Sequence, residues 1–229
     1  MFVRHCFAVR VLKGGLSHAE YCLYRQISEK GRAGLRSMNI KNIPGTVLEM
    51  EKMDNATGME FLNKVFFITN GIMLGQIREI TGLDGTTLQN WVKRGWVGNP
   101  KNKTYDREQL ARILLINMMR DTMQLSRVIF LLTYVNGTDE IDRIVPESRF
   151  YDYICRTLCL ITSPESAGLN GIDTAIDEVL SDYTEPVGGA KRRLAVGIRV
   201  AVLSYYASLI KSIADDTLDG LGADTKRKR

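Results

Sequence analysis

The sequence predicts a mainly α-helical protein with a small β-ribbon near its middle. Three observations carry this prediction. Apolar residues recur at helical spacing through most of the chain beyond residue 70. Glycines and capping residues bracket two short helices between residues 71 and 95. A turn-rich segment, WVGNPKNKTY at 96–105, interrupts the helical pattern and favours a ribbon.

Composition is that of an ordinary globular protein, with 229 residues of which 45% are hydrophobic and 25% charged. The most apolar stretch, at 194–210, carries Arg199 in its middle and falls just short of a membrane span. We therefore favour a buried core or interface helix over a membrane helix. The N-terminus lacks the continuous apolar region of a signal peptide, so we expect a cytoplasmic protein.

The net charge of +5 comes entirely from the first 37 residues, which hold seven Lys/Arg against two Asp/Glu. They also contain both histidines and two of the four cysteines. We expect translation to begin at Met38 and residues 1–37 to be a basic leader outside the native protein. A genuine basic arm is the alternative. In either case, the overall pI is no argument for DNA binding.

Residues 38–70 are expected to form an N-terminal extension with a helix at Gly58–Ile68. The next helix follows from the apolar residues between 74 and 80 and ends at Gly82. A tight turn leads to a second helix at Thr87–Arg94, for which Thr86 and Gln89 fit a capping box and Gly95 fits a stop. Two short helices joined by such a turn form a helix-turn-helix pattern.

The second helix divides its residues between two faces. Leu88, Trp91 and Val92 form one narrow apolar stripe, and Gln89, Asn90 and Lys93 lie opposite, with Arg94 at the edge. Side-chain amides and cations, with no acidic residue between them, can form hydrogen bonds with the edges of DNA bases and with phosphates. A simple solvated helix face is the alternative.

After this helix, Lys101, Lys103 and Tyr105 are expected to project from a short β-ribbon behind a turn at 98–100. Asp106 and Gln109 fit a second capping box, and two apolar helices follow. This order over 71–137 is that of a winged helix-turn-helix domain. The net charge is +4 over 86–112 and −8 over 128–190, which indicates two surfaces with different roles.

The run TLQNWVKRGWV resembles the second helix of MerR-type regulators, in which the pattern is Thr-Leu-Arg-aromatic-Tyr-x-x-x-Gly-Leu-Leu. Gln89 stands at the usual arginine of that pattern, and Asn90 replaces an aromatic residue. Three features carry the resemblance: the helix residues, the basic-x-Tyr that closes the wing, and the apolar pair of the later helix. These are Thr87, Leu88, Trp91 and Gly95; Lys103-Thr104-Tyr105; and Leu125 with Ile129.

The long coiled coil that follows a MerR head is not evident. In this respect the chain is similar to the bacterial domain-of-unknown-function family 1836, whose MerR-like head is followed by a compact helical region. The matching segments are Leu88–Trp96, Ala111–Asn117 and YVNG at Tyr134–Gly137, and the resemblance spans roughly Met38 to Ala214. It implies a DNA-binding head and little else about function.

Residues 138–216 are expected to form a helical C-terminal domain with helices around 150–161, 172–180 and 191–213. Helix-turn-helix proteins usually read two half-sites as dimers, so we favour a homodimer formed through this domain. A monomeric helical cap is the alternative. The basic tail at 217–229 is expected to be disordered.

No residue spacing indicates catalysis, a metal site or a bound cofactor, and we expect no enzyme. Cys155 and Cys159 lie four apart on one helix, and we interpret them as buried packing residues. The alternative is a redox or metal sensor in which the two cysteines pair across a dimer. His5 and His18 lack a nearby nucleophile.

We therefore expect a DNA-binding transcriptional regulator that binds double-stranded DNA and no membrane. The second helix is expected to enter the major groove, while the wing at 97–105 binds the DNA backbone. A winged-helix protein-interaction module that does not read DNA is the alternative. The expected DNA-binding residues are Thr87, Gln89, Asn90, Lys93, Arg94, Lys101, Lys103 and Tyr105.

Overall fold

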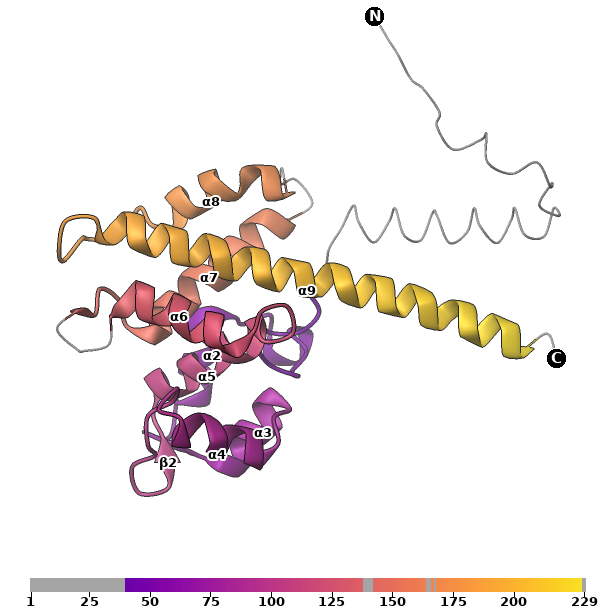
Figure 1. Ribbon diagram of the computed structural model, residues 1–229, viewed down its shortest axis with the longest axis horizontal. Helices are drawn as coiled ribbons and strands as arrows, with labels where there is room; N and C mark the ends of the chain where they lie inside the picture. Colours follow the sequence, from indigo (N-terminus) through magenta and orange to yellow (C-terminus); the bar gives the residue numbers. More distant parts are fainter. Residues whose placement is uncertain (1–39, 138–141, 164–165, 167, 228–229) are drawn as a thin grey trace, which may run out of the picture. The chain divides into compact units, whose positions relative to one another are not determined.

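The structure is a computed structural model that describes residues 40–137, 142–163, 166 and 168–227. Within these residues the chain is mainly helical, as predicted, and its named strands form one two-stranded sheet. The predicted leader at 1–37 lies outside the described residues. The elements, drawn in Figure 1, are two 3₁₀ helices, η1 (Glu51–Met53) and η3 (Gly168–Gly171); the strands β1 (Ile72–Met73) and β2 (Thr104–Tyr105); and the helices α2 (Gly58–Val65), α3 (Leu74–Thr81), α4 (Gly85–Lys93), α5 (Arg107–Met119), α6 (Leu125–Asn136), α7 (Glu147–Thr162), α8 (Ile172–Val179) and α9 (Ala190–Arg227).

The two strands join the segment before α3 to the segment before α5. They pair antiparallel, with Ile72 opposite Tyr105 and Met73 opposite Thr104. α3 follows β1 directly and ends, as predicted, at Gly82, whose φ of 69° is in the left-handed region that favours glycine. The two-stranded sheet therefore fixes where α3 begins relative to the ribbon.

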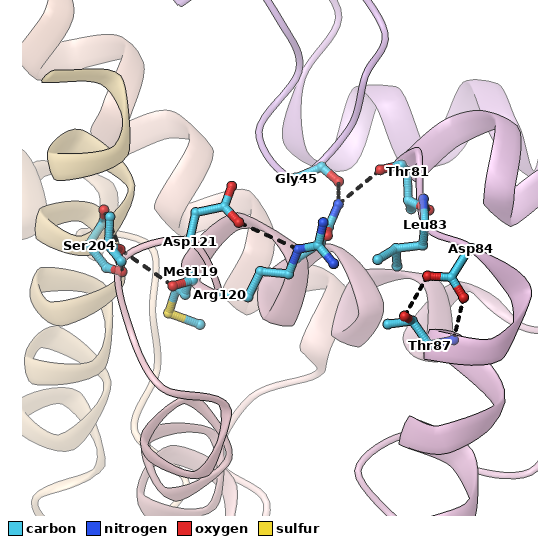
Figure 2. Close-up of polar contacts among 11 residues, drawn as sticks. Gly45, Thr81, Leu83, Asp84, Thr87, Met119, Arg120, Asp121 and Ser204 are labelled. Atoms are coloured by element: carbon cyan, nitrogen blue, oxygen red, sulfur yellow. Dashed lines mark hydrogen bonds and ion pairs between the residues drawn. The ribbon is translucent and has the colours of Figure 1, made fainter. Parts of the chain in front are cut away.

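α4 begins two residues earlier than predicted. Its N-cap is Asp84, whose carboxylate accepts hydrogen bonds from the N–H and the hydroxyl of Thr87 at 2.8 and 2.6 Å (Figure 2). The capping box predicted for Thr86 and Gln89 is therefore wrong, because the carboxylate of Asp84 starts the helix at Gly85.

α5 is a buried helix that packs against α3, α6 and α7. Its predicted capping box is confirmed: the Asp106 carboxylate accepts from the N–H of Gln109 at 2.9 Å, and the Gln109 side chain accepts from the N–H of Asp106 at 3.0 Å. Eight of its thirteen residues are buried, so this helix is covered on nearly all sides; they are Leu110, Ala111, Ile113, Leu114, Leu115, Ile116, Met118 and Met119.

The side-chain amide of Asn117 links α5 to two segments that precede it. It donates to the carbonyl oxygen of Gly45 at 2.9 Å and to that of Thr81 at 3.1 Å (Figure 2). Gly45 has a φ of 78° and lies so close to α5 that an added Cβ would stand 2.5 Å from the carbonyl oxygen of Leu114. The loop around Gly45 and the end of α3 are thus both fixed to α5.

α7 is attached to α5 through the first residues of α7. The Glu108 carboxylate accepts from the N–H of Ser148 at 2.9 Å and from its hydroxyl. The Arg112 guanidinium donates to the carboxylate of Glu147 at 2.6 Å and, through Nε, to the carbonyl oxygen of Trp96. Glu147 is only 5% exposed, and burial raises its pKa against the opposing effect of Arg112.

The first part of α9 packs beside α6 and α7 (Figure 1). At Gly197, a Cβ would lie 2.4 Å from the side chain of Val135 and 3.3 Å from that of Phe150. Farther along, the hydroxyls of Thr122 and Ser204 are 2.6 Å apart. Because residue 135 lies beside 197 and residue 122 lies beside 204, α6 and α9 run antiparallel.

The described residues of Met38–Ser212 form one compact unit. It takes in the predicted extension (38–70), the predicted head (71–137) and most of the predicted helical domain (138–216). The reason is α7, which packs against α2 and α5. The head and the helices that follow it therefore share one hydrophobic core.

α9 continues as a helix into a second unit, which includes Ile213–Arg229. The helix runs to Arg227 through the segment for which a disordered basic tail, 217–229, is predicted, and that part of the domain division stays a prediction. Among the described residues, α9 is long and apolar enough over Ala190–Gly220 to cross a membrane. The core helix of a soluble protein can have the same length and composition, so these two properties are compatible with a membrane and with a protein core.

The two cysteines of α7 have different environments. Cys155 is completely buried, and burial raises the pKa of its thiol to about 12. Cys159 is exposed, so the prediction that both are buried is right only for Cys155. Within the part of the chain that the structure describes, no three His, Cys, Asp or Glu side chains are grouped to hold a metal ion.

Replacing Arg112 by Met should lower the free energy of unfolding by about 3 kcal/mol, because the buried Glu147 carboxylate then loses its cation. Urea denaturation followed by circular dichroism measures this cost. Arg120→Met is the matched control, since Arg120 caps the end of the same helix and pairs with the exposed Asp121 at 3.6 Å. The control should cost at most about 1 kcal/mol. Equal costs for the two variants would contradict the role of Arg112.

Thiol labelling should separate the two cysteines of α7. In a chain carrying Cys6→Ser and Cys22→Ser, a disulfide reagent at pH 8 should modify Cys159 in the native protein and Cys155 only after unfolding, because Cys159 is exposed and Cys155 is completely buried. Cys155→Ala should also cost about 1 kcal/mol or more of stability through the cavity it leaves. Rapid labelling of both thiols in the native protein would show that this account of Cys155 is wrong.

Candidate nucleic-acid interface

The two faces of α4 are arranged as the sequence predicts. Leu88 and Trp91 are 0% and 2% exposed and lie in the core. Gln89, Asn90 and Lys93 are exposed together on the opposite face. Leu88 and Trp91 thus anchor the helix in the core, so that the two amides and the lysine point toward solvent.

The end of α4 places a further cation beside this face. Gly95, with a φ of 71°, closes the helix as predicted, and its N–H donates to the carbonyl oxygen of Val92 at 2.9 Å. The guanidinium of the exposed Arg94 then stands 5.0 Å from the centre of the Trp96 ring. Because Arg112 binds the carbonyl oxygen of Trp96, this ring and the arginine above it rest on α5.

A tight hairpin turn presents the two lysines of the ribbon. The backbone groups of Lys101 and Thr104 exchange two hydrogen bonds of 2.9 Å, and the residues between them, Asn102 and Lys103, have φ values of 51° and 63°. Such a turn matches the twist of a β-hairpin. Lys101 and Lys103 are exposed, and the turn lies at 102–103 rather than at the predicted 98–100.

The residues before this turn are also held by α5. The side-chain amide of Gln109 donates to the carbonyl oxygens of Gly98 and Asn99 at 3.0 and 2.9 Å. The side chain of Gln109 therefore has two roles. Its oxygen completes the capping box of α5, and its nitrogen binds the backbone at the start of the ribbon. The ribbon is positioned by backbone contacts to a buried helix.

A groove of about 650 Å³ lies between α4, the start of α3 and the ribbon. Two residues of α4 (Gln89 and Lys93) and two of the ribbon (Asn99 and Lys103) contribute polar groups to it. The other lining residues are largely apolar, and none of the described residues that line it is acidic; they are Met73, Leu74, Gly75, Val92, Pro100 and Tyr105.

Two of the expected DNA-binding residues have structural partners. The Thr87 hydroxyl donates to Asp84 in the cap of α4. Tyr105 is 4% exposed, and burial raises the pKa of its phenol. Tyr105 is paired with Ile72 in the sheet, and both side chains are buried in the core. Six of the eight residues are therefore exposed at this surface: Gln89, Asn90, Lys93, Arg94, Lys101 and Lys103.

Sequence reasoning missed the other contributors to the groove. Asn99 was assigned only to a turn, although an amide two residues before a lysine in a basic segment was a usable signal. Met73 and Leu74 reach the groove because β1 pairs with β2. A strand of two residues has no periodicity that a sequence can display.

Residues 41–154 match the model of a family described as Domain of unknown function (DUF1836). No curated protein and no solved structure matches the chain. The match confirms the predicted resemblance to family 1836, over a shorter range than the predicted 38–214. The resemblance to MerR-type regulators stays a prediction. From the loop before η1 to the middle of α7, the chain is thus similar to the family described as DUF1836.

Proposed function

We propose that the chain is a DNA-binding transcriptional regulator that uses a MerR-like winged helix-turn-helix head. One observation supports this above all. One amide and one lysine of α4 (Gln89 and Lys93) and one amide and one lysine of the ribbon (Asn99 and Lys103) line one groove, whose described lining residues include no acid. Nucleic acid presents phosphates and base edges side by side, and such a surface complements both.

In this proposal α4 enters the major groove of DNA. An α-helix with its side chains is about 10–12 Å across, and the major groove, about 12 Å wide, admits one. Gln89 and Asn90 have side-chain amides that can bond both the N6 and the N7 of adenine. Lys93, one turn from Gln89, serves guanine or a phosphate.

The remaining cations bind the DNA backbone in this proposal. Lys103 lines the groove, and Arg94 and Lys101 are exposed cations next to lining residues in the sequence. Together they supply the charge that phosphates require. Thr87 and Tyr105 take supporting roles, since one completes the cap of α4 and the other anchors β2 in the core.

The alternative of a protein-interaction module has an observation of its own. Met73 at the groove is 60% exposed, and nearby in the sequence Phe67 and Ile68 are 86% and 94% exposed. Exposed apolar residues of this kind are suited to a peptide as well. Salt dependence separates the two functions, because counterion release is a property of phosphate binding.

Changing the two ribbon lysines should weaken binding to every DNA sequence. The variant Lys101→Ala with Lys103→Ala should reduce the slope of log K against log salt by nearly two units if each lysine binds one phosphate. Fluorescence anisotropy with mixed genomic duplexes at several salt concentrations measures the slope. Lys41→Ala with Lys52→Ala is the matched control, because it removes two exposed charges away from the groove. If both double variants change the slope alike, the ribbon has no special role.

Changing the amides of α4 should have a different effect. Gln89→Ala or Asn90→Ala should cost about 1–3 kcal/mol on the preferred sequence and relax the preference for it. The comparison needs a sequence selected from genomic fragments and a scrambled one, each titrated with both variants. Asn63→Ala on the exposed side of α2 is the matched control. Unchanged affinity and preference in both α4 variants would remove α4 as a reading helix.

A further inference from the structure

α9 is apolar on two sides, and only one side is used by the core. The buried side packs into the compact unit through Leu194, Ile198, Ala201, Val202 and Tyr205. Another face of the helix carries Val196, Leu203 and Ile210, which are 39%, 43% and 43% exposed. These three residues are spaced by seven, the repeat that keeps a helix face directed toward a second helix.

α6 adds exposed aromatic side chains beside α9. Tyr134 is 41% exposed and lines a shallow pocket together with Val187 and Arg192 at the start of α9. Phe130, one turn earlier on α6, is 72% exposed. We call Phe130, Tyr134, Val196, Leu203 and Ile210 the α6–α9 face.

We propose that the α6–α9 face binds a second copy of this chain, with the two α9 helices antiparallel and crossing at Leu203. The spacing supports a self-complementary contact, because Val196 and Ile210 are each seven residues from Leu203. In an antiparallel pair about that residue, Leu203 meets Leu203 of the other copy and Val196 meets Ile210. A twofold interface of this kind uses the same surface on both subunits.

The charges along α9 favour the same direction. The helix starts with Lys191, Arg192 and Arg193, and the stretch 213–224 carries only acidic charges, before the basic end at Lys226 and Arg227. Antiparallel packing brings the basic start of one helix toward the acidic part of the other, whereas parallel packing brings like charges together. Complementary charges at the ends of paired helices fix their orientation.

A membrane is the competing occupant of an apolar helix face. Arg199 lies on the exposed side of α9 between Val196 and Leu203, its side chain is 49% exposed, and it pairs with Asp173 of α8. A charged pair in the middle of the apolar stripe is costly in hydrocarbon and is tolerated at the rim of a protein interface. The arrangement therefore fits a second copy better than a lipid bilayer.

Light scattering coupled to size exclusion tests the proposal on the full chain. Wild-type protein at tens of micromolar should have the mass of a dimer, and Leu203→Glu should shift it to the monomer with an unchanged circular dichroism spectrum. Ile68→Glu is the matched control, because it places the same charge at an exposed apolar residue outside the face and should leave the dimer intact. A monomeric wild type, or a dimeric Leu203→Glu variant, overturns the proposal.

Disulfide crosslinking tests the direction of the helices. In a chain with Cys6, Cys22 and Cys159 changed to Ser, Leu203→Cys should crosslink to itself on mild oxidation, and Val196→Cys alone should not. Val196→Cys mixed with Ile210→Cys should give a mixed dimer. Crosslinking of Val196→Cys to itself would overturn the antiparallel arrangement.

Sedimentation with phosphatidylglycerol vesicles tests the competing occupant. If the wild type sediments with the vesicles and the Leu203→Glu variant does not, the α6–α9 face binds a membrane and the proposal is overturned. None of these outcomes depends on DNA binding.

Discussion

The partly buried guanidinium of Arg112 makes the contacts on which the arrangement of the molecule depends. It joins the carbonyl oxygen of Trp96, just after α4, to the carboxylate of Glu147 at the start of α7. These two segments are 51 residues apart in the sequence, and α5 carries the side chain that connects them. Removing Arg112 leaves the buried Glu147 carboxylate without its cation, which is more costly than the loss of a surface ion pair.

The candidate interface rests on α5 through side chains that bind backbone carbonyl oxygens. Gln109 holds the start of the ribbon, Arg112 holds the segment after α4, and Asn117 holds the end of α3. Each side chain thus positions the backbone of a different part of the surface. Binding groups placed on a rigid scaffold lose little entropy when a ligand arrives, and this arrangement suits the recognition of DNA that we propose.

Local features of the fold could be predicted from the sequence, and distant contacts could not. The caps at Asp106, Gly82 and Gly95 depend on neighbouring residues, so residue identity and spacing find them. At the start of α4 the same reasoning fails, because Asp84 and Thr86 both offer a capping oxygen and the structure uses Asp84. The outward face of α4 follows from the inward face of Leu88 and Trp91. The burial of Tyr105 and the shape of the groove depend on the pairing of β1 with β2, which no local pattern encodes. The same holds for the contact of Arg112 with Glu147.

Binding of DNA at α4 and the ribbon is the central claim, and mapping of amide chemical shifts tests it most directly. Isotope-labelled protein would be titrated with short genomic duplexes at low salt, and the backbone resonances would be followed residue by residue. The account predicts that the shifts concentrate on α4 and residues 98–104, and that they disappear at high salt. Shifts that are absent, or that concentrate on the α6–α9 face, would contradict it.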